Sequence, residues 1–318
     1  MKPAQGCILE MSRSPTQEEF ELNPNPAFGG YAECAPHDPH PRPALVRLPP
    51  GACDTHAHVC GPQSRYPLVP NRLYNPPEAS VAEYRQMLDA LGIERAVLVQ
   101  PSVYGTDNRA MLDALKQDPV RLRGVAVLPF DASADDLASL HRLGIRGVRC
   151  NIVDLKDGKG QLPLAGLRQL AQTIRPWGWH IEFLMHVNEF DDLAEQLGQL
   201  DVPLVFGHLG YVPAERGVTP GFQGLLELAQ AGKAWIKLTA PYRLTPEPYP
   251  YPGTASCADL LLSQVPDRLL WGSDWPHVFI KSAMPNDGDL FNLFLRWLGN
   301  RDLIQSIMVD HPAQLYGF

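Results

Sequence analysis

The chain has 318 residues, of which 45% are hydrophobic and 19% are charged, with a formal net charge of −8 at pH 7. This is enough apolar material for one or two domains with a large core. A mild negative charge without a basic stripe argues against nucleic acid and anionic membranes as partners, although a few local arginines could still bind an anionic small molecule. No apolar run reaches membrane-spanning length, and the N-terminus lacks the apolar stretch of a signal peptide, so we expect a cytoplasmic enzyme.

Residues 1–50 are rich in proline and polar residues, and they predict an extended arm with little regular structure of its own. Such an arm could pack on the rest of the chain or on a neighbouring subunit, which leaves a homo-oligomer open. The six cysteines are scattered without C-x-x-C spacing. Free thiols are therefore expected rather than disulfides or a zinc knuckle.

From residue 51 to the end, short apolar runs alternate with longer amphipathic stretches. The runs predict eight strands, at 53–59, 95–102, 122–129, 147–152, 180–186, 203–210, 234–239 and 269–275. The stretches between them predict helices at 79–91, 107–117, 134–143, 163–175, 190–199, 221–231, 255–264 and 286–298, with Thr106 or Asp107 and Ser133 as N-caps. Several strands are almost continuously apolar, which is typical of buried parallel strands. Residues 51–318 therefore predict one (β/α)8 TIM barrel; a doubly wound sheet is the alternative, without a G-x-G-x-x-G motif to support it.

The sequence Asp54-Thr55-His56-Ala57-His58 ends the first predicted strand. Side chains alternate along a strand, so His56 and His58 should share a face, about 7 Å apart along it, together with Asp54. Such a pair can hold a metal or flank a substrate carbonyl. An isolated H-x-H is more often a pair of solvated histidines, so its meaning depends on the other strand ends.

Other polar residues fall at the ends of later strands, where a barrel places its active site. They are Gln100, Ser102, Tyr104, Arg149, His186, His208, Thr239, Arg243, Asp274 and His277. Buried ionisable groups are costly without partners, so this set is hard to explain as packing alone. Glu182 and Lys237 are expected to form an internal ion pair. The remaining histidines are expected to be structural (His141, His180, His311) or solvated (His37, His40).

Taken together, these motifs resemble the amidohydrolase superfamily: DTHAH matches its first-strand H-x-H, GHLG its sixth-strand histidine, and WGSDWPH its eighth-strand aspartate. The longer segments VLVQPSVYGTDNRAMLDAL, GIRGVRCN and KLTAPYRL resemble the pyrone-dicarboxylate lactonases within it. The resemblance covers roughly residues 50–318.

The resemblance implies a role for each matching residue. Asp274 would be the general base that activates water, while His56, His58 and His208 would polarise a lactone carbonyl or hold a metal that does so. Arg149 and Arg243 would bind a substrate carboxylate. The other expected substrate contacts are Tyr74, Ser102, Tyr104, Tyr211 and His277.

The chain also departs from those lactonases. Tyr211 replaces an arginine, Leu184 replaces a tyrosine, and another arginine is lost near Leu155, where Lys156 could substitute in part. His186 supplies the strand-5 histidine of metal-dependent superfamily members, whereas the pyrone lactonase works without metal. The residues therefore predict one divalent ion, zinc or a similar metal, with a metal-free site as the alternative. The expected ligands are His56, His58, His186, His208 and Asp274.

The function predicted from these residues is hydrolysis of a cyclic ester, a carboxylated lactone or pyrone from aromatic or sugar-acid breakdown. Water attack on a lactone carbonyl needs a base and a cation near the developing oxyanion. The alternatives are a metal-dependent decarboxylase of the same superfamily and a barrel without catalysis.

Overall fold

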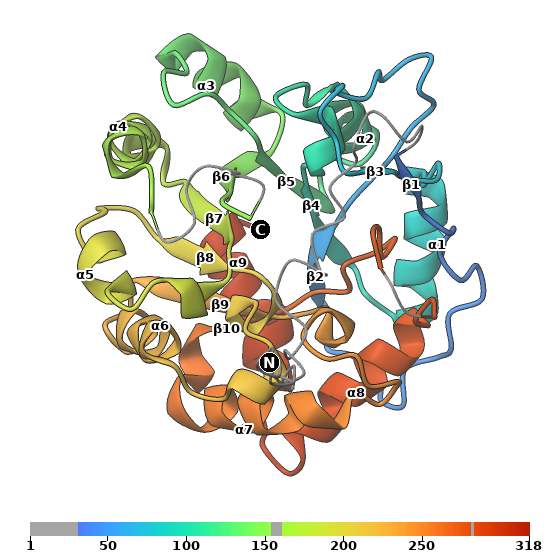
Figure 1. Ribbon diagram of the computed structural model, residues 1–318. Coiled ribbons are helices and arrows are strands. Elements are labelled where there is room, and N and C mark those ends of the chain that lie inside the picture. The colour runs from blue at the N-terminus through green and yellow to red at the C-terminus, as the bar shows by residue number, and fades with distance from the viewer. Residues whose placement is uncertain (1–30, 154–160, 281–282) are drawn as a thin grey trace, which may run out of the picture.

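The computed structural model describes residues 31–153, 161–280 and 283–318. Its centre is a sheet of eight parallel strands, in which each strand pairs with its neighbours in chain order (Figure 1). The strands are β2 (Cys53–Ala57), β4 (Arg95–Val99), β5 (Leu122–Ala126), β6 (Ile145–Asn151), β7 (His180–Leu184), β8 (Leu204–Phe206), β9 (Ala234–Leu238) and β10 (Leu269–Trp271). The ring closes where the segment after β10 meets β2, because the His58 amide donates to the Trp275 carbonyl at 2.7 Å. The predicted barrel is confirmed.

Helices surround the strands on the outside of the ring (Figure 1). They are α1 (Val81–Leu91), α2 (Arg109–Gln117), α3 (Ala134–Arg142), α4 (Leu164–Ile174), α5 (Leu193–Leu197), α6 (Pro220–Gln230), α7 (Ala255–Gln264) and α8 (Asp287–Leu298). The predicted cap at Ser133 is confirmed, since its hydroxyl accepts the Asp136 amide. The cap predicted at Thr106 or Asp107 is wrong by one or two residues: α2 starts after Asn108, which makes no side-chain cap bond.

The C-terminal helix α9 (His311–Tyr316) fills the end of the barrel at which the strands begin, and it lies at the centre of the ring in Figure 1. Its Leu315 and Tyr316 pack against the inward-facing Cys53, Val97 and Trp235. Five cysteines are free thiols, as predicted. With this end closed by packed side chains among the described residues, the carboxyl ends of the strands are where we expect a substrate to enter.

The strands end earlier than predicted, and the polar residues of interest lie just beyond them. β8 ends at Phe206 and β10 at Trp271, so His208 and Asp274 belong to the loops that follow. Both residues have left-handed backbone, with φ of 52° and 66°. Non-glycine residues adopt this conformation at a cost of order 1–3 kcal/mol each, and such residues cluster at functional sites.

The described part of the N-terminal arm packs on the barrel of its own chain. This is one of the two arrangements expected from the sequence; the other was packing on a neighbouring subunit. Strand β1 (Ala32–Glu33) pairs in parallel with β3 (Tyr74–Asn75) in the long loop after β2. The prediction that His37 is solvated is wrong, because its ring packs on Trp275 with a centroid distance of 4.7 Å. The arm therefore covers the loop that carries Asp274.

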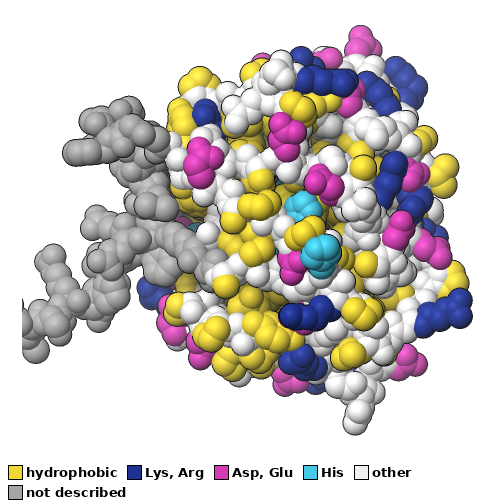
Figure 2. All heavy atoms as spheres, turned by 90° about the vertical axis from the view of Figure 1, so that its right-hand side faces the viewer, with side chains coloured by type: hydrophobic (Ala, Val, Ile, Leu, Met, Phe, Trp, Pro, Cys, Tyr) yellow, Lys and Arg dark blue, Asp and Glu magenta, His cyan; other side chains and the backbone are white. Residues whose placement is uncertain are grey.

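The surface that faces the viewer in Figure 2 mixes acidic and basic side chains with hydrophobic ones, and no basic stripe crosses it. Among the residues described, no helix combines the length and apolar character needed to cross a bilayer.

Inside the barrel, Lys237 of β9 and Glu182 of β7 form the predicted ion pair, with Nζ 2.7 Å from Oε2 and both side chains almost fully buried. Burial works against the charge on Glu182, but the charge of Lys237, with His180 and His56 close by, holds the pKa of Glu182 well below the ordinary value. Nζ also donates to the carbonyl of Thr55 at 2.7 Å. The pair therefore fastens β2 to β7 and β9 below the H-x-H motif.

Replacing one member of this pair should be far more damaging than replacing both. Lys237→Met should lower the free energy of unfolding by about 3–5 kcal/mol, because Glu182 keeps a buried charge without its partner. The double variant Lys237→Met/Glu182→Leu should recover most of that loss, since packed apolar side chains can replace a buried ion pair. Denaturant unfolding of the three proteins measures both values; a single variant within about 1 kcal/mol of wild type would contradict the assignment.

Candidate active site

Three acceptor atoms meet above the ion pair at the carboxyl end of the barrel. Oδ1 of Asp274 lies 3.5 Å from Nε2 of His56 and 3.6 Å from Nε2 of His58. All three side chains are buried, and the three atoms lie within 4.8 Å of one another. The strand-face prediction for the two histidines therefore leads to a real cluster, and the aspartate after β10 completes it.

The other ring nitrogens of the two histidines are held from behind. Nδ1 of His58 lies 2.7 Å from the Val99 carbonyl, which can only accept, so this nitrogen carries the hydrogen and Nε2 presents a lone pair. Nδ1 of His56 lies 3.1 Å from Oε1 of Glu182 and 3.2 Å from Nζ of Lys237. The Lys237 ammonium can only donate, so its contact favours an Nδ1 that accepts, whereas the Glu182 contact favours an Nδ1 that carries the hydrogen. The second tautomer leaves the lone pair on Nε2, and it is the one that a metal on Nε2 would require. Burial and the Lys237 charge lower the pKa of His56 to about 3, so the ring is neutral at physiological pH.

Asp54 does not join this cluster, contrary to the alternation argument. Its carboxylate accepts hydrogen bonds from the Tyr84 hydroxyl of α1 at 2.9 Å and from the Ser273 amide at 2.9 Å. The register of β2 against β4 shifts between Asp54 and Ala57, which breaks the strict alternation of faces. Burial raises the pKa of Asp54 to about 6, against the lowering effect of these hydrogen bonds.

The two oxygens of Asp274 have different environments. Oδ2 accepts from the Tyr242 hydroxyl at 2.6 Å and from Nε and Nη2 of Arg243 at 2.9 and 2.7 Å. Oδ1 has no hydrogen-bond donor among the described residues. Burial raises the pKa of Asp274, but the charge of Arg243 and the nearby histidines outweigh it and hold the pKa well below the ordinary value. The side chain is therefore an anion whose Oδ2 is hydrogen-bonded to Arg243 and Tyr242 and whose Oδ1 can bind a ligand.

This donor set fits a divalent metal ion. An anionic oxygen facing two imidazole lone pairs at about 3.5 Å is repulsive unless a cation or hydrogens lie between them. Nε2 of His56 and Oδ1 of Asp274 are both buried without a partner in the described parts of the chain. Buried polar atoms are rarely left unsatisfied, and two nitrogens with one carboxylate oxygen are ligands that zinc accepts. The geometry thus shows a group that could hold a metal.

His208 lies beside the three-atom group, not within it. Its ring is 5.2 Å from that of His56, and its buried Nδ1 has no partner among the described residues. Burial holds the pKa of His208 well below the ordinary value despite the Asp274 charge. A neutral imidazole with an unpartnered Nδ1 in this position is available to a substrate oxygen or as a further ligand.

His186, predicted as a metal ligand, is held from behind by a backbone carbonyl as His58 is, and its role as a ligand stays a prediction. Its Nδ1 lies 2.7 Å from the carbonyl of Tyr211, and the two rings stack with centroids 4.3 Å apart. His208, Leu209, Gly210 and Tyr211 form a continuous left-handed turn, with φ between 52° and 80°. His186 therefore holds the end of the strained turn that places His208, and it lies outside the three-atom group.

Arg149 of β6 supplies a buried positive charge at the same end of the barrel. Its Nη1 donates to the Gln100 carbonyl at 2.8 Å, and its charge reaches both His208 and Tyr74. Both Arg149 and Ser102 lie near enough to Tyr74 to lower its pKa against the effect of burial, so these three predicted substrate contacts lie near one another. The predicted partial substitute Lys156, near Leu155, falls outside the described residues.

Three predicted substrate contacts have other partners. Arg243 is engaged by Asp274 and by the Val278 carbonyl through Nε and Nη2, so at most its Nη1 remains for a ligand. Tyr104 is buried, and its hydroxyl accepts the Gly61 amide at 3.1 Å. His277 is completely buried, with Nδ1 next to the Tyr242 hydroxyl and Nε2 next to Asp287. The side chains of Tyr104 and His277 are thus bound to other protein groups, and neither points its polar atoms at the three-atom group.

Sequence reasoning missed Tyr242 and Asp287. Tyr242 precedes Arg243 in the loop after β9, so its position near a strand end was a usable signal. Asp287 begins α8, far along the chain from any strand end. Its contact with His277 depends on tertiary packing that the pattern does not encode.

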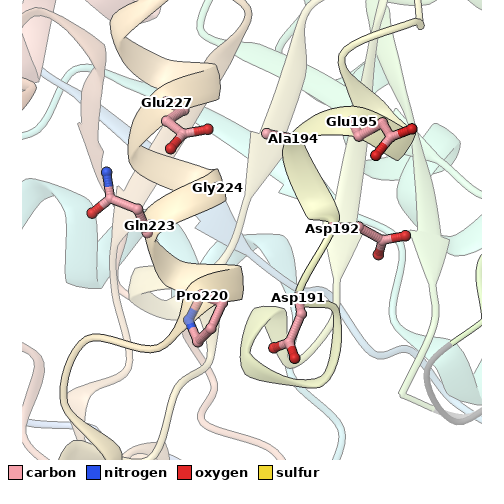
Figure 3. A pocket seen from close by; sticks show the side chains of 8 residues that line it. All are labelled: Asp191, Asp192, Ala194, Glu195, Pro220, Gln223, Gly224 and Glu227. Carbon is pink, nitrogen blue, oxygen red and sulfur yellow. The ribbon is translucent and has the colours of Figure 1, made fainter.

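A separate hollow lies on the outside of the barrel, between α5 and α6. It is lined by Asp191, Asp192, Ala194, Glu195, Pro220, Gln223, Gly224 and Glu227. Figure 3 shows its acidic side chains coming from both sides of the groove. None of these residues belongs to the histidine group, and exposed carboxylates of this kind are ordinarily solvated.

Comparison with known proteins agrees with this geometry. The amidohydrolase family model matches residues 53–318. A 4-sulfomuconolactone hydrolase of Hydrogenophaga intermedia is 35% identical over 288 residues, which cover 90% of this chain and 95% of the relative. A 2-pyrone-4,6-dicarboxylate hydrolase of Comamonas testosteroni is 34% identical, over 87% of this chain and 93% of the relative.

Solved structures show the same fold. One from Pseudomonas putida, assigned provisionally to the 2-pyrone-4,6-dicarboxylic acid hydrolases, superposes with a TM-score of 0.73 at 35% identity, covering 85% of this chain and 98% of the other. The matched region contains all eight barrel strands and every residue of the three-atom group. The chain therefore belongs to the amidohydrolase family.

Proposed function

We propose that this enzyme hydrolyses a lactone that carries an anionic group. The observation that carries the proposal is the group of His56, His58 and Asp274 at the mouth of the barrel, with Arg149 nearby. Relatives at 34–35% identity are named for the hydrolysis of sulfomuconolactone and pyrone dicarboxylate. Both compounds are cyclic esters with anionic substituents, and this favours lactone hydrolysis over decarboxylation.

The residues divide the work of ester hydrolysis between them. Asp274 accepts the proton of the attacking water on Oδ1, the oxygen that Arg243 and Tyr242 leave available. His208 faces the lactone carbonyl and stabilises the oxygen as negative charge develops on it. Arg149, with Tyr74 and Ser102, binds the anionic substituent and orients the ring for attack.

We further propose that His56, His58 and Asp274 hold a divalent ion, with zinc as the expected metal and His208 as the remaining candidate ligand. When bound, the ion would lower the pKa of water to about 7. This chemistry matters here because the pKa of Asp274 lies well below the ordinary value, which makes the carboxylate a weak base for ordinary water. The free thiols fit a reducing compartment, so the cytoplasm remains the proposed location.

Asp274→Asn tests the base. The amide cannot accept the water proton, so hydrolysis of 4-sulfomuconolactone or 2-pyrone-4,6-dicarboxylate, whichever the wild type opens, should fall at least about 100-fold. Initial rates give the measurement, and circular dichroism checks the fold. A variant that keeps more than about a tenth of the wild-type rate would exclude Asp274 as the base.

Arg149→Met tests the anion site. Loss of a charge-assisted hydrogen bond of roughly 1.5–3 kcal/mol should reduce kcat/KM for the anionic lactone by about 10- to 100-fold. A neutral lactone of similar size serves as the control and should lose less than about threefold, because it makes no such bond. Equal losses on the two substrates would show that Arg149 supports the barrel and does not select the anion.

A further inference from the structure

A line of buried hydrogen bonds runs from Asp274 to the first turn of α8. The Tyr242 hydroxyl donates to Oδ2 of Asp274 at 2.6 Å and lies 2.9 Å from Nδ1 of His277. Nε2 of His277 lies 3.0 Å from Oδ1 of Asp287. His277 and Asp287 are completely buried, and Tyr242 is 7% exposed. Such a line is costly to bury unless each member is satisfied by the next.

The outer end of this line is firmly anchored. Asp287 is the first residue of α8, where the partial positive charge of the helix terminus favours a carboxylate. The preceding Asn286 caps the helix by accepting the Gly288 amide at 3.1 Å. Asn286 also accepts the Arg42 amide at 2.9 Å and donates to Asp38 at 2.8 Å, so the N-terminal arm is bound to the same turn.

The inner end needs such an anchor. Asp274 has left-handed backbone with φ of 66°, and His277 has φ of 61°, so the loop between β10 and α8 is strained. A carboxylate on a strained loop is free to rotate about χ2 unless its second oxygen is held. Arg243 and Tyr242 both bind Oδ2. Arg243 is held in turn by the Val278 carbonyl of the same loop, whereas Tyr242 is held through the His277 ring by the first turn of α8.

We propose that Tyr242, His277 and Asp287 are positioning residues that fix the orientation of the Asp274 carboxylate and keep its Oδ1 directed at the two histidines. The line acts at a distance from any substrate, because His277 and Asp287 have no exposed surface. This proposal rests on the proposed function, in which Asp274 is the general base and a metal ligand. Partners of this kind behind a catalytic or metal-binding side chain typically contribute about 10- to 100-fold in activity or metal affinity.

Two variants break the line and two leave it intact. Tyr242→Phe removes the inner hydroxyl, and Asp287→Ala removes the outer acceptor. Asp287→Asn keeps an oxygen that can accept from His277, so it should rescue the line. Asn292→Ala is the matched control: it lies on α8 and binds the arm at Leu45 and Pro43, but it makes no bond to the line.

Steady-state kinetics and crystal structures test the proposal together. Tyr242→Phe and Asp287→Ala should lower kcat about 10- to 100-fold with KM within about twofold, and Oδ1 should rotate away from the histidines. Asp287→Asn and Asn292→Ala should keep kcat within about threefold, with Asn292→Ala lowering only the unfolding temperature. An unrotated carboxylate with an unchanged kcat in Asp287→Ala, or an equal loss of kcat in Asn292→Ala, would overturn the proposal.

The same experiment separates this proposal from the proposed function. If wild type opens no lactone, the proposed function fails, and the orientation of Asp274 in the crystal structures decides the role of the line by itself. Zinc affinity, measured by competition with a chelating dye, gives a second readout: the line-breaking variants should bind zinc about 10- to 100-fold more weakly than Asn292→Ala. Equal affinities with an unrotated carboxylate would count against the line.

Discussion

The structure depends on holding three acceptor atoms close together in a buried place where they repel one another. Nε2 of His56, Nε2 of His58 and Oδ1 of Asp274 gain nothing from their mutual contact. Each side chain is held there by its other polar atom. Lys237 and Glu182 contact Nδ1 of His56, the Val99 carbonyl binds Nδ1 of His58, and Arg243 with Tyr242 binds Oδ2 of Asp274. Holding the two Nε2 atoms and Oδ1 at one place costs folding free energy, and such an arrangement is what a cation site requires.

The barrel supplies the means of holding them. Parallel strands bring residues that are far apart in sequence to one end, while α9 fills the other end with packed side chains. The Lys237–Glu182 pair sits between these two regions and links the packed interior to His56. On the outer side, α8 and the arm hold the loop after β10 through Asn286 and the contact of His37 with Trp275. The arm therefore packs against the loop after β10 and the first turn of α8.

The sequence predicted the barrel and the cluster well because both follow from periodicity. Alternating strands and helices gave the order of elements, and strand ends led to His56, His58, His208 and Asp274. Prediction of contacts was weaker where tertiary packing decides them. The register shift in β2 turns Asp54 away, and the left-handed turn after β8 brings Tyr211 onto His186, which no local pattern indicates. The ion pair between Arg243 and Asp274 could not be predicted either. The sequence pattern of an arginine after a strand is the same whether it binds a substrate or a neighbouring carboxylate.

The three-atom group is proposed to bind a divalent ion that hydrolysis needs. The most direct measurement is the metal content of protein purified without chelators, followed by removal of the metal and its restoration while lactone hydrolysis is assayed. The account predicts close to one zinc or similar ion per chain, with activity lost on removal and regained on restoration. Full activity in the metal-free protein would contradict it and would mean that His56, His58 and His208 act on the carbonyl directly.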